Sequence, residues 1–433
     1  MDHFAFERID SIVMPLHRLW SLPPVCIMAG LSLMVPAAQA QLLPSAGPVG
    51  QAVPGLLDRV GGVAEQAVAD SLSPARLASQ LAAARTARID DLLRRHGDRI
   101  ELDDRRQPAR RGVLLLTGAD ERAQMALRAA GYAMDGEAME GIGLSVIRLT
   151  VPQGRSLRRA MGEVRKIAPG AQVSADNLYF PSGPALALTA EALAMNGPVR
   201  GRAVGLIDGG VARHPALSGP IEQRGFAGGA PLASSHGTAV ASLIGGQGAI
   251  GGAAPGAPLL VADVYGNDPA GGGAFAIVRA LGWMVARGTP VVTISLVGPA
   301  NSLLEGAIRL ASDRGVTVVA AVGNDGPAAP PAYPASYAGV VAVTGVDGRG
   351  RLLPEAGRAL HVDFAAPGAD MKAASADGGR VAVRGTSFAA PLVAGRLFLS
   401  GGVDALRAEA TLPKGAARGY GAGILCGSCR NID

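Results

Sequence analysis

The sequence contains few charged and few aromatic residues. Of its 433 residues, 17% are charged and 4% are aromatic, whereas 48% are hydrophobic. A chain that is disordered throughout is excluded, because disordered chains combine low hydrophobicity with high charge. The length allows one large core and at least one smaller domain. Because aromatic residues are scarce, we expect Ala, Val and Leu to fill most of the core.

Long apolar runs are missing beyond the amino-terminal region. After residue 40, no run reaches the roughly 18 apolar residues of a membrane-spanning helix, so we expect no stable membrane span. The net charge is +5, but the Arg-rich stretch at 94–111 mixes both signs and is expected to be a solvated face. No basic patch interleaved with aromatic residues accompanies it, and we therefore expect no nucleic-acid partner.

Cysteine is rare, with three residues in the whole chain. Cys426 and Cys429 form a C-x-x-C pair, which can close a small disulfide loop in an oxidising compartment. A redox motif of the thioredoxin kind is disfavoured because no redox fold surrounds the pair. Two ligands alone also make a poor zinc site.

The first forty residues resemble an export signal, and the third cysteine, Cys26, lies within them. His17 and Arg18 precede a moderately apolar stretch, and Ala38-Gln39-Ala40 matches the small-x-small cleavage rule. Residues 1–13 fit a signal poorly because they carry carboxylates, so we hypothesise that the natural start is Met14. We therefore expect export to the periplasm or the extracellular medium.

Beyond this leader, which spans 1–40, the sequence divides into further segments. Residues 41–109 are rich in Ala at helical spacing and predict a helical spacer. Residues 110–182 follow a β-α-β-α-β rhythm, with a further strand near 133–139, and predict a small α+β domain. A linker rich in Pro and Gly at 183–200 then leads to the last segment, residues 201–433.

Residues 201–433 predict a doubly wound α/β domain. Apolar runs that are uniform at every position alternate with helical stretches, which predicts a mainly parallel sheet with helices on both faces. Ser302 and Glu305 are expected to form the capping box of one helix. The expected strands are 203–207, 259–264, 291–296 and 316–322, and the expected helices are 236–246, 274–287 and 302–314.

Three residues of this domain have the chemistry of a nucleophilic catalytic triad. Asp208 ends the first expected strand, His236 lies at the start of a helix, and Ser387 lies at the start of another helix. A serine hydroxyl needs an adjacent base to become nucleophilic, and the imidazole needs a carboxylate to fix its tautomer. Ligands bind such a sheet at the carboxyl ends of its strands, which is where these residues are expected.

The order of the triad along the chain excludes one familiar arrangement. No histidine follows Ser387, whereas an α/β-hydrolase has the order Ser, Asp, His. Position 389 is Ala, so the full G-x-S-x-G motif of that fold is also absent.

A series of short motifs resembles the subtilisin-like (subtilase) family over roughly half of the chain, and the order Asp, His, Ser is that of subtilisin. The resemblance implies a secreted serine endopeptidase that cleaves polypeptide substrates through an acyl-enzyme. The motifs are LIDGG, HGTAVA, AAPGAPLLVADVY, ISLVGP, AAVGNDG, DFAAPG and GTSFAAP, in the order of the family.

The resemblance also implies further site residues. Asn324 would donate its amide to the oxyanion, together with the backbone N–H of Ser387. Two stretches would hold the substrate and wall the pocket for a hydrophobic side chain; alternatively, they are only buried strand ends. They are Ser295, Leu296, Val297 and Gly298, and Ala320, Ala321, Val322 and Gly323.

The chain departs from the family pattern at Gly209, where a Thr or Ser usually follows the catalytic Asp. The missing hydroxyl leaves a second class of function open, a catalytically weak or silent binding protein on a subtilase fold. A third class, a serine peptidase with a Glu base, is disfavoured by His236 in its glycine-flanked motif.

The α+β domain at 110–182 resembles a subtilase propeptide in its position and rhythm. This implies that it assists folding and occupies the cleft until the chain is cut between about Phe180 and Gly201; a permanently attached domain is the alternative. Calcium often supports the family, but no loop has the dense carboxylate spacing that would let ligands be named. No cofactor and no metal-binding residue is therefore assigned.

Overall fold

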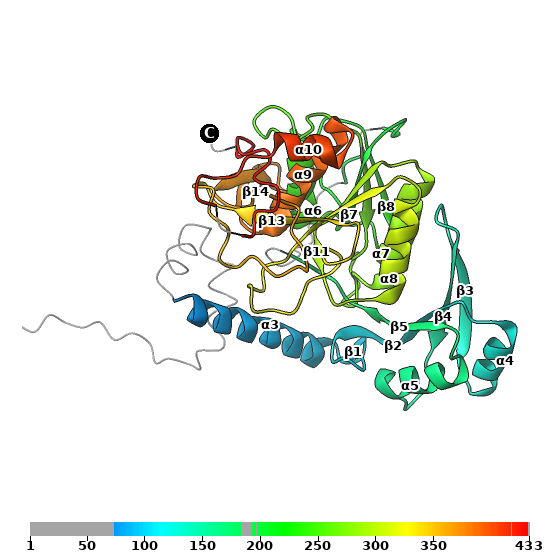
Figure 1. Ribbon diagram of the computed structural model, residues 1–433. Helices are drawn as coiled ribbons and strands as arrows, with labels where there is room; N and C mark the ends of the chain where they lie inside the picture. The colour runs from blue at the N-terminus through cyan, green and yellow to red at the C-terminus, as the bar shows by residue number, and fades with distance from the viewer. Residues whose placement is uncertain (1–72, 183–192, 196, 417, 432–433) are drawn as a thin grey trace, which may run out of the picture. The chain divides into compact units, whose positions relative to one another are not determined.

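The computed structural model describes residues 73–182, 193–195, 197–416 and 418–431 (Figure 1). All of these residues belong to one compact unit, Pro48–Asp433. The expected signal peptide, the start at Met14, Cys26 and residues 183–192 of the expected linker fall outside the described residues.

A seven-stranded sheet organises the carboxyl-terminal domain, in the order β14-β13-β12-β10-β7-β9-β8, with every neighbouring pair parallel. Most of its strands are buried at every position, as the uniform apolar runs predicted. The strands are β7 (Val204–Asp208), β8 (Ile221–Gly225), β9 (Leu259–Asp263), β10 (Val291–Ile294), β12 (Thr317–Ala321), β13 (Val341–Val346) and β14 (Phe364–Pro367).

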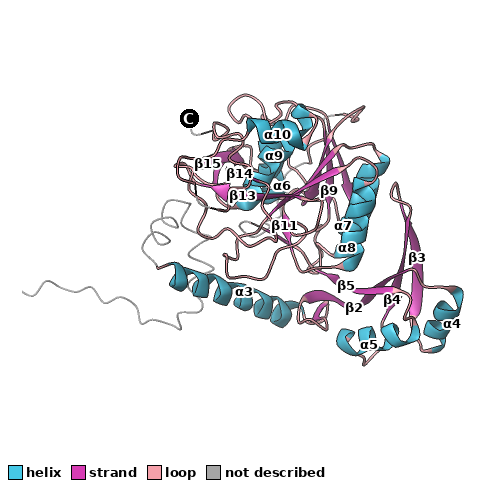
Figure 2. Ribbon diagram, in the orientation of Figure 1, coloured by secondary structure: helices cyan, strands magenta, loops and turns pink. Residues whose placement is uncertain are grey.

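Helices cover both faces of this sheet (Figure 2), and successive strand residues such as Leu206 and Ile207 point to opposite apolar layers. One layer contains α7 (Ala274–Ala286) and α8 (Ser302–Ser312), and the other contains α6 (Ser235–Gly245) and α9 (Thr386–Ser400). The expected doubly wound α/β fold is therefore confirmed. The strands and helices predicted for this domain are all present; of the seven strands of the sheet, β8, β13 and β14 were not predicted.

The amino terminus of α8 corrects the expected capping box. The cap is Asn301, whose side-chain oxygen accepts from the backbone N–H of Leu303 at 3.1 Å and of Leu304 at 3.3 Å. Ser302 is already helical, because the Tyr337 hydroxyl bonds both the N–H and the C=O of Asn301 and holds that residue outside the helix.

An antiparallel five-stranded sheet with two helices on it forms the α+β region that was expected. Its first strand, β1, lies within the stretch that we assigned to the helical spacer, so the sheet begins before residue 110. The long helix α3 (Pro74–His96) precedes it. The other elements are β1 (Ile100–Leu102), β2 (Pro108–Thr117), α4 (Glu121–Ala129), β3 (Ala133–Met139), β4 (Leu144–Thr150), α5 (Leu157–Ile167) and β5 (Gln172–Asn177).

Short elements complete the described chain. The strand β6 (Phe180–Pro181) pairs with β11 (Leu296–Val297), and β15 (Met371–Ala374) pairs with β16 (Arg380–Val383). After α10 (Val403–Glu409), a disulfide joins Cys426 and Cys429.

Within the described residues, no single helix has the length and apolar composition of a membrane span. The helices α9 and α10 pass that test only as a pair, and they are bent by 111° at the break between them. Most of α9 is buried in the core of the α/β domain.

Candidate active site

The carboxylate of Asp208 stands at the carboxyl end of β7 and is fully buried. One of its oxygens accepts the backbone N–H of Gly209 at 2.7 Å. Gly209 has no side-chain hydroxyl, but its main chain still holds the Asp208 carboxylate.

A second buried carboxylate, Asp263, lies beside Asp208 at the end of β9. It accepts three backbone N–H groups, those of Leu232, Tyr265 and Gly266, at 2.8–3.0 Å. Burial raises the pKa of Asp263, and the nearby Asp208 raises it further, while the three amides lower it. Asp263 thus binds the main chain of its own loop and of a neighbouring one, whereas Asp208 is directed at the imidazole of His236.

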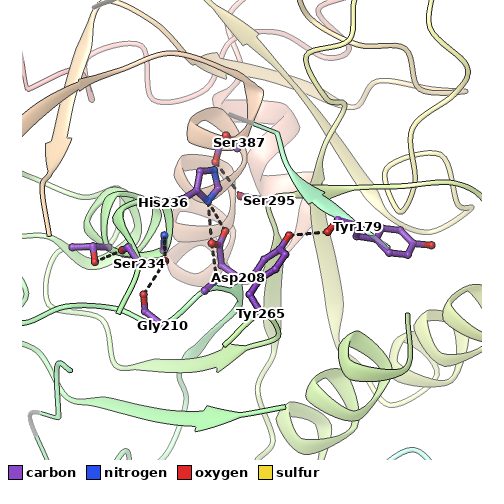
Figure 3. A network of polar contacts seen from close by, with 11 residues as sticks. Tyr179, Asp208, Gly210, Ser234, His236, Tyr265, Ser295 and Ser387 are labelled. Carbon is purple, nitrogen blue, oxygen red and sulfur yellow. Dashed lines mark hydrogen bonds and ion pairs between the residues drawn. The ribbon is translucent and has the colours of Figure 1, made fainter. Parts of the chain in front are cut away.

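His236 is the second residue of α6, and its imidazole is buried against Asp208 (Figure 3). Its Nδ1 lies 2.9 Å and 3.0 Å from the two carboxylate oxygens. The ring also packs near Phe388, with centroids 5.4 Å apart. The helix is anchored by Ser234, whose hydroxyl accepts from Gly237 N and donates to Gly210 O, both at 3.0 Å.

Ser387 is the second residue of α9, and Figure 3 shows its side chain next to the imidazole of His236, on the side opposite Asp208. Its carbonyl oxygen accepts from the Ser295 hydroxyl at 2.9 Å, which holds the first turn of α9 in place. Ser387 Oγ and His236 Nε2 are both buried, and neither has a hydrogen-bond partner among the described residues. Catalytic hydrogen bonds are often long until substrate binds, so this arrangement suits a nucleophile and its base.

Asn324 follows β12 and faces the start of α9. Its Oδ1, rather than its Nδ2 amide, is bonded to the start of α9, where it accepts the backbone N–H of Thr386 at 3.0 Å. Gly385 precedes α9 with φ +133, and a Cβ there would lie 2.5 Å from Asn324 Nδ2. Only glycine fits this approach of the amide to the helix terminus. Sequence reasoning missed Gly385, although it directly precedes the Thr-Ser pair.

The two predicted substrate-binding stretches have different surroundings. Ser295 to Gly298 include β11, which pairs with β6 as an extended peptide would. In the other stretch, Ala320 and Val322 pack in one core layer and Ala321 packs in the other. These three residues therefore match the alternative that the stretch is a buried strand end. Gly323 lies next to the start of α9, since its backbone N–H donates to the Thr386 hydroxyl at 3.0 Å.

Among the described residues, no group of three or more His, Cys, Asp and Glu side chains could hold a metal ion.

Comparison with known proteins places residues 200–400 in the subtilase family. Subtilisin BL of Lederbergia lenta is 36% identical over 207 residues, which cover 45% of this chain and 74% of the relative. The thermostable alkaline protease of Halalkalibacterium halodurans is 33% identical over 209 residues, covering 45% of this chain and 55% of the relative.

Among solved structures, fervidolysin from Fervidobacterium pennivorans, a keratinolytic enzyme related to subtilisin, has a TM-score of 0.60 and 19% sequence identity. The match covers 75% of this chain and 61% of fervidolysin, and it shows the fold. The identity to Subtilisin BL over most of that protein, with the family match at residues 200–400, shows that the chain belongs to the subtilase family of serine endopeptidases.

Proposed function

We propose that the chain is an exported endopeptidase that cleaves peptide bonds through an acyl-enzyme on Ser387. His236 accepts the Ser387 proton and passes it to the leaving nitrogen, and Asp208 holds the imidazole in the tautomer that has Nε2 free. The contact of His236 Nδ1 with the Asp208 carboxylate at 2.9 Å, with Ser387 on the opposite side of the ring, is the observation that supports this assignment best.

Asn324 supplies the oxyanion donor in this proposal. The first backbone N–H groups of a helix have no partner within it, so the amino terminus of α9 adds donors and a favourable dipole at the same place. Negative charge appears on the carbonyl oxygen only in the tetrahedral state, so a fixed amide stabilises that state more than the substrate.

Replacing Asn324 with alanine is expected to lower kcat about 10²- to 10³-fold with little change in KM, a magnitude that comes from the same kind of donor in subtilisin. Steady-state kinetics on a peptide substrate measures this loss. Asn324→Asp is the matched control, because it keeps an oxygen to accept the Thr386 N–H but loses the donor. If the Asp variant regains full activity while the Ala variant does not, Asn324 only shapes the loop.

We also propose that the α+β domain is a propeptide. Its Asp176 accepts the backbone N–H of Phe275, at the start of α7, at 2.9 Å, and Arg110 lies 2.9 Å from both an oxygen of Asp268 and the carbonyl of Ala270. Burial raises the pKa of Asp176, while the Phe275 amide and Arg110 lower it. Arg110 was expected on a solvated face, but these contacts place it against the α/β domain.

The contacts continue along the same strand and from α3. The side-chain amide of Asn301, the α8 cap, donates to the carbonyl of Ala175 and the side chain of Asn177, both at 2.9 Å. Arg85 of α3 lies 3.3 Å from Asp325, the residue after Asn324. A domain that bonds the first residues of α7 and α8, with α3 reaching the residue after Asn324, suits a folding aid and inhibitor. Permanent attachment is the alternative.

Export is proposed from the leader at 1–40, and the Cys426–Cys429 disulfide favours an oxidising compartment. A relative that is 32% identical over 204 residues is the minor extracellular protease Epr of Bacillus subtilis, and the match covers 45% of this chain and 31% of that relative.

Mass spectrometry of the purified protein, together with a casein or peptide hydrolysis assay, tests the whole proposal. We expect a start near Gln41 in the exported precursor, release of the α+β domain and hydrolysis of added peptide. An intact chain without hydrolytic activity would favour the silent binding protein instead.

A further inference from the structure

An ion pair between Arg384 and Glu355 lies next to the candidate oxyanion site. Nη2 of Arg384 donates to Oε2 of Glu355 at 2.8 Å, and Nε lies 2.8 Å from Oε1. The two side chains are only 7% and 15% exposed. Arg384 directly precedes Gly385, whereas Glu355 lies in the segment between β13 and β14. The pair therefore joins the approach to α9 with a segment 29 residues away in the chain.

The segment of Glu355 also holds the loop that carries Asn324. The carbonyl of Glu355 accepts the backbone N–H of Gly326 at 3.0 Å, and the N–H of Gly357 donates to the carbonyl of Gly323 at 2.6 Å. These two hydrogen bonds flank Asn324 on both sides along the chain. Glu355 thus fixes the loop through its main chain, while its side chain is bonded to the residue before the glycine that starts α9.

The start of α9 is bonded to the same loop from the other direction. The N–H of Thr386 donates to Asn324 Oδ1 at 3.0 Å, and the Thr386 hydroxyl bonds the N–H and the C=O of Gly323 at 3.0 and 3.1 Å. Thr386 follows Arg384 by two residues. The contacts therefore close a circuit that runs from Asn324 to the start of α9, back to Arg384, across to Glu355 and from its carbonyl to the loop.

The position of the Asn324 amide matters more for the reaction than the ion pair matters for stability. A donor stabilises the oxyanion only if it is already fixed where the charge appears. A displacement of about 1 Å in a catalytic site can cost about 10²-fold in rate. An ion pair withdrawn from water adds little net stability over apolar residues of similar volume, but the planar guanidinium fixes a geometry at two points.

We propose that Arg384 and Glu355 are positioning residues for the reaction, and that their ion pair keeps the Asn324 amide at the place where the oxyanion forms. This role rests on the proposed function of Ser387 and Asn324. The negative charge develops after the substrate has bound, so the pair affects kcat rather than KM.

Steady-state kinetics of the double variant Arg384→Met/Glu355→Gln, made in the wild-type and in the Asn324→Ala protein, tests this role. Because both charges are removed, neither is left without its partner, and Tm is expected to change little. On a casein peptide we expect kcat to fall about 10- to 100-fold with little change in KM. In Asn324→Ala, where the donor is already lost, the same change should lower kcat less than about twofold.

Arg396→Met/Glu409→Gln is the matched control. Arg396 lies on α9 and bonds Glu409 at two points, both at 2.9 Å, with about a third of each side chain exposed. This variant should retain the wild-type kcat. If the first double variant does not fold, Arg384→Lys gives the same test, because the ammonium keeps the charge pair but lacks the planar fork. Its loss of kcat should likewise disappear in the Asn324→Ala protein.

The outcomes separate this inference from the proposed function. An equal fold-loss of kcat with and without Asn324 would show that the pair does not act through that amide, and it would overturn the inference while the peptidase remains. A wild-type kcat in the folded double variant also overturns it. If the wild-type protein does not cut the peptide, or if Asn324→Ala keeps full activity, the corresponding part of the proposed function fails together with this inference.

Discussion

Replacing Ser387 with alanine is expected to lower kcat for peptide hydrolysis about 10⁶-fold, a magnitude taken from the catalytic serine of the relative subtilisin. The variant loses the only atom that can form the acyl-enzyme in this proposal, while Asn324 and the start of α9 can still bind the carbonyl. We therefore also expect the precursor to remain uncut. Hydrolysis of casein or a peptide over time measures the loss of kcat, and mass spectrometry shows whether the precursor is cut.

Ser400→Ala is the matched control for this experiment, because Ser400 ends the same helix and its hydroxyl bonds only local carbonyls among the described residues. It should retain wild-type hydrolysis and processing. Normal hydrolysis by the Ser387→Ala protein would end the assignment of the nucleophile.

The second large effect is expected from Asp208→Asn, with kcat lower by about 10⁴-fold, the loss known for the same change in a serine protease of another fold. The amide can donate to His236 Nδ1, and the ring proton then lies on Nε2, where it blocks acceptance of the Ser387 proton. The Gly209 N–H still finds an oxygen acceptor, so the strand end need not move. Steady-state kinetics at neutral pH measures the loss.

Asp263→Asn serves as the comparison, since Asp263 is the neighbouring buried carboxylate and bonds three backbone amides. Loss of an acceptor there is expected to reduce the free energy of unfolding by about 1–3 kcal/mol, seen as a lower Tm, with kcat of the folded enzyme retained. If Asp208→Asn changes Tm but not kcat, its carboxylate serves only the fold.

The elements closest to the candidate site were predictable because their signals are local. β7, β9, β10 and β12 are apolar at nearly every position, and parallel strands bring their carboxyl ends to one edge. This reasoning placed Asp208, His236 and Ser387 near each other, and the structure brings them together. Their catalytic roles remain proposals.

Three strands of the seven-stranded sheet escaped prediction for different reasons. β8 is an edge strand with a polar sequence, and its strand state depends on pairing with β9. β14 is short and ends at a proline, whereas β13 has an apolar run that could have identified it.

Contacts between segments that lie far apart in the chain could not be predicted, because they produce no local pattern in the sequence. Arg110 and Asp268 lie 158 residues apart in the chain, and the local charge pattern around Arg110 indicated only a solvated face. The pairing of β6 with β11 likewise left no signal, because it involves only two residues of each strand. Such pairings follow from the assembled fold rather than from periodicity.

Labelling with a fluorophosphonate probe, followed by mapping of the modified residue, tests the central claim most directly, because only an activated serine reacts. The account predicts one adduct on Ser387 in the processed wild-type protein and none in the His236→Ala variant. An unlabelled wild-type protein, an adduct on a different serine, or equal labelling without the imidazole would contradict it.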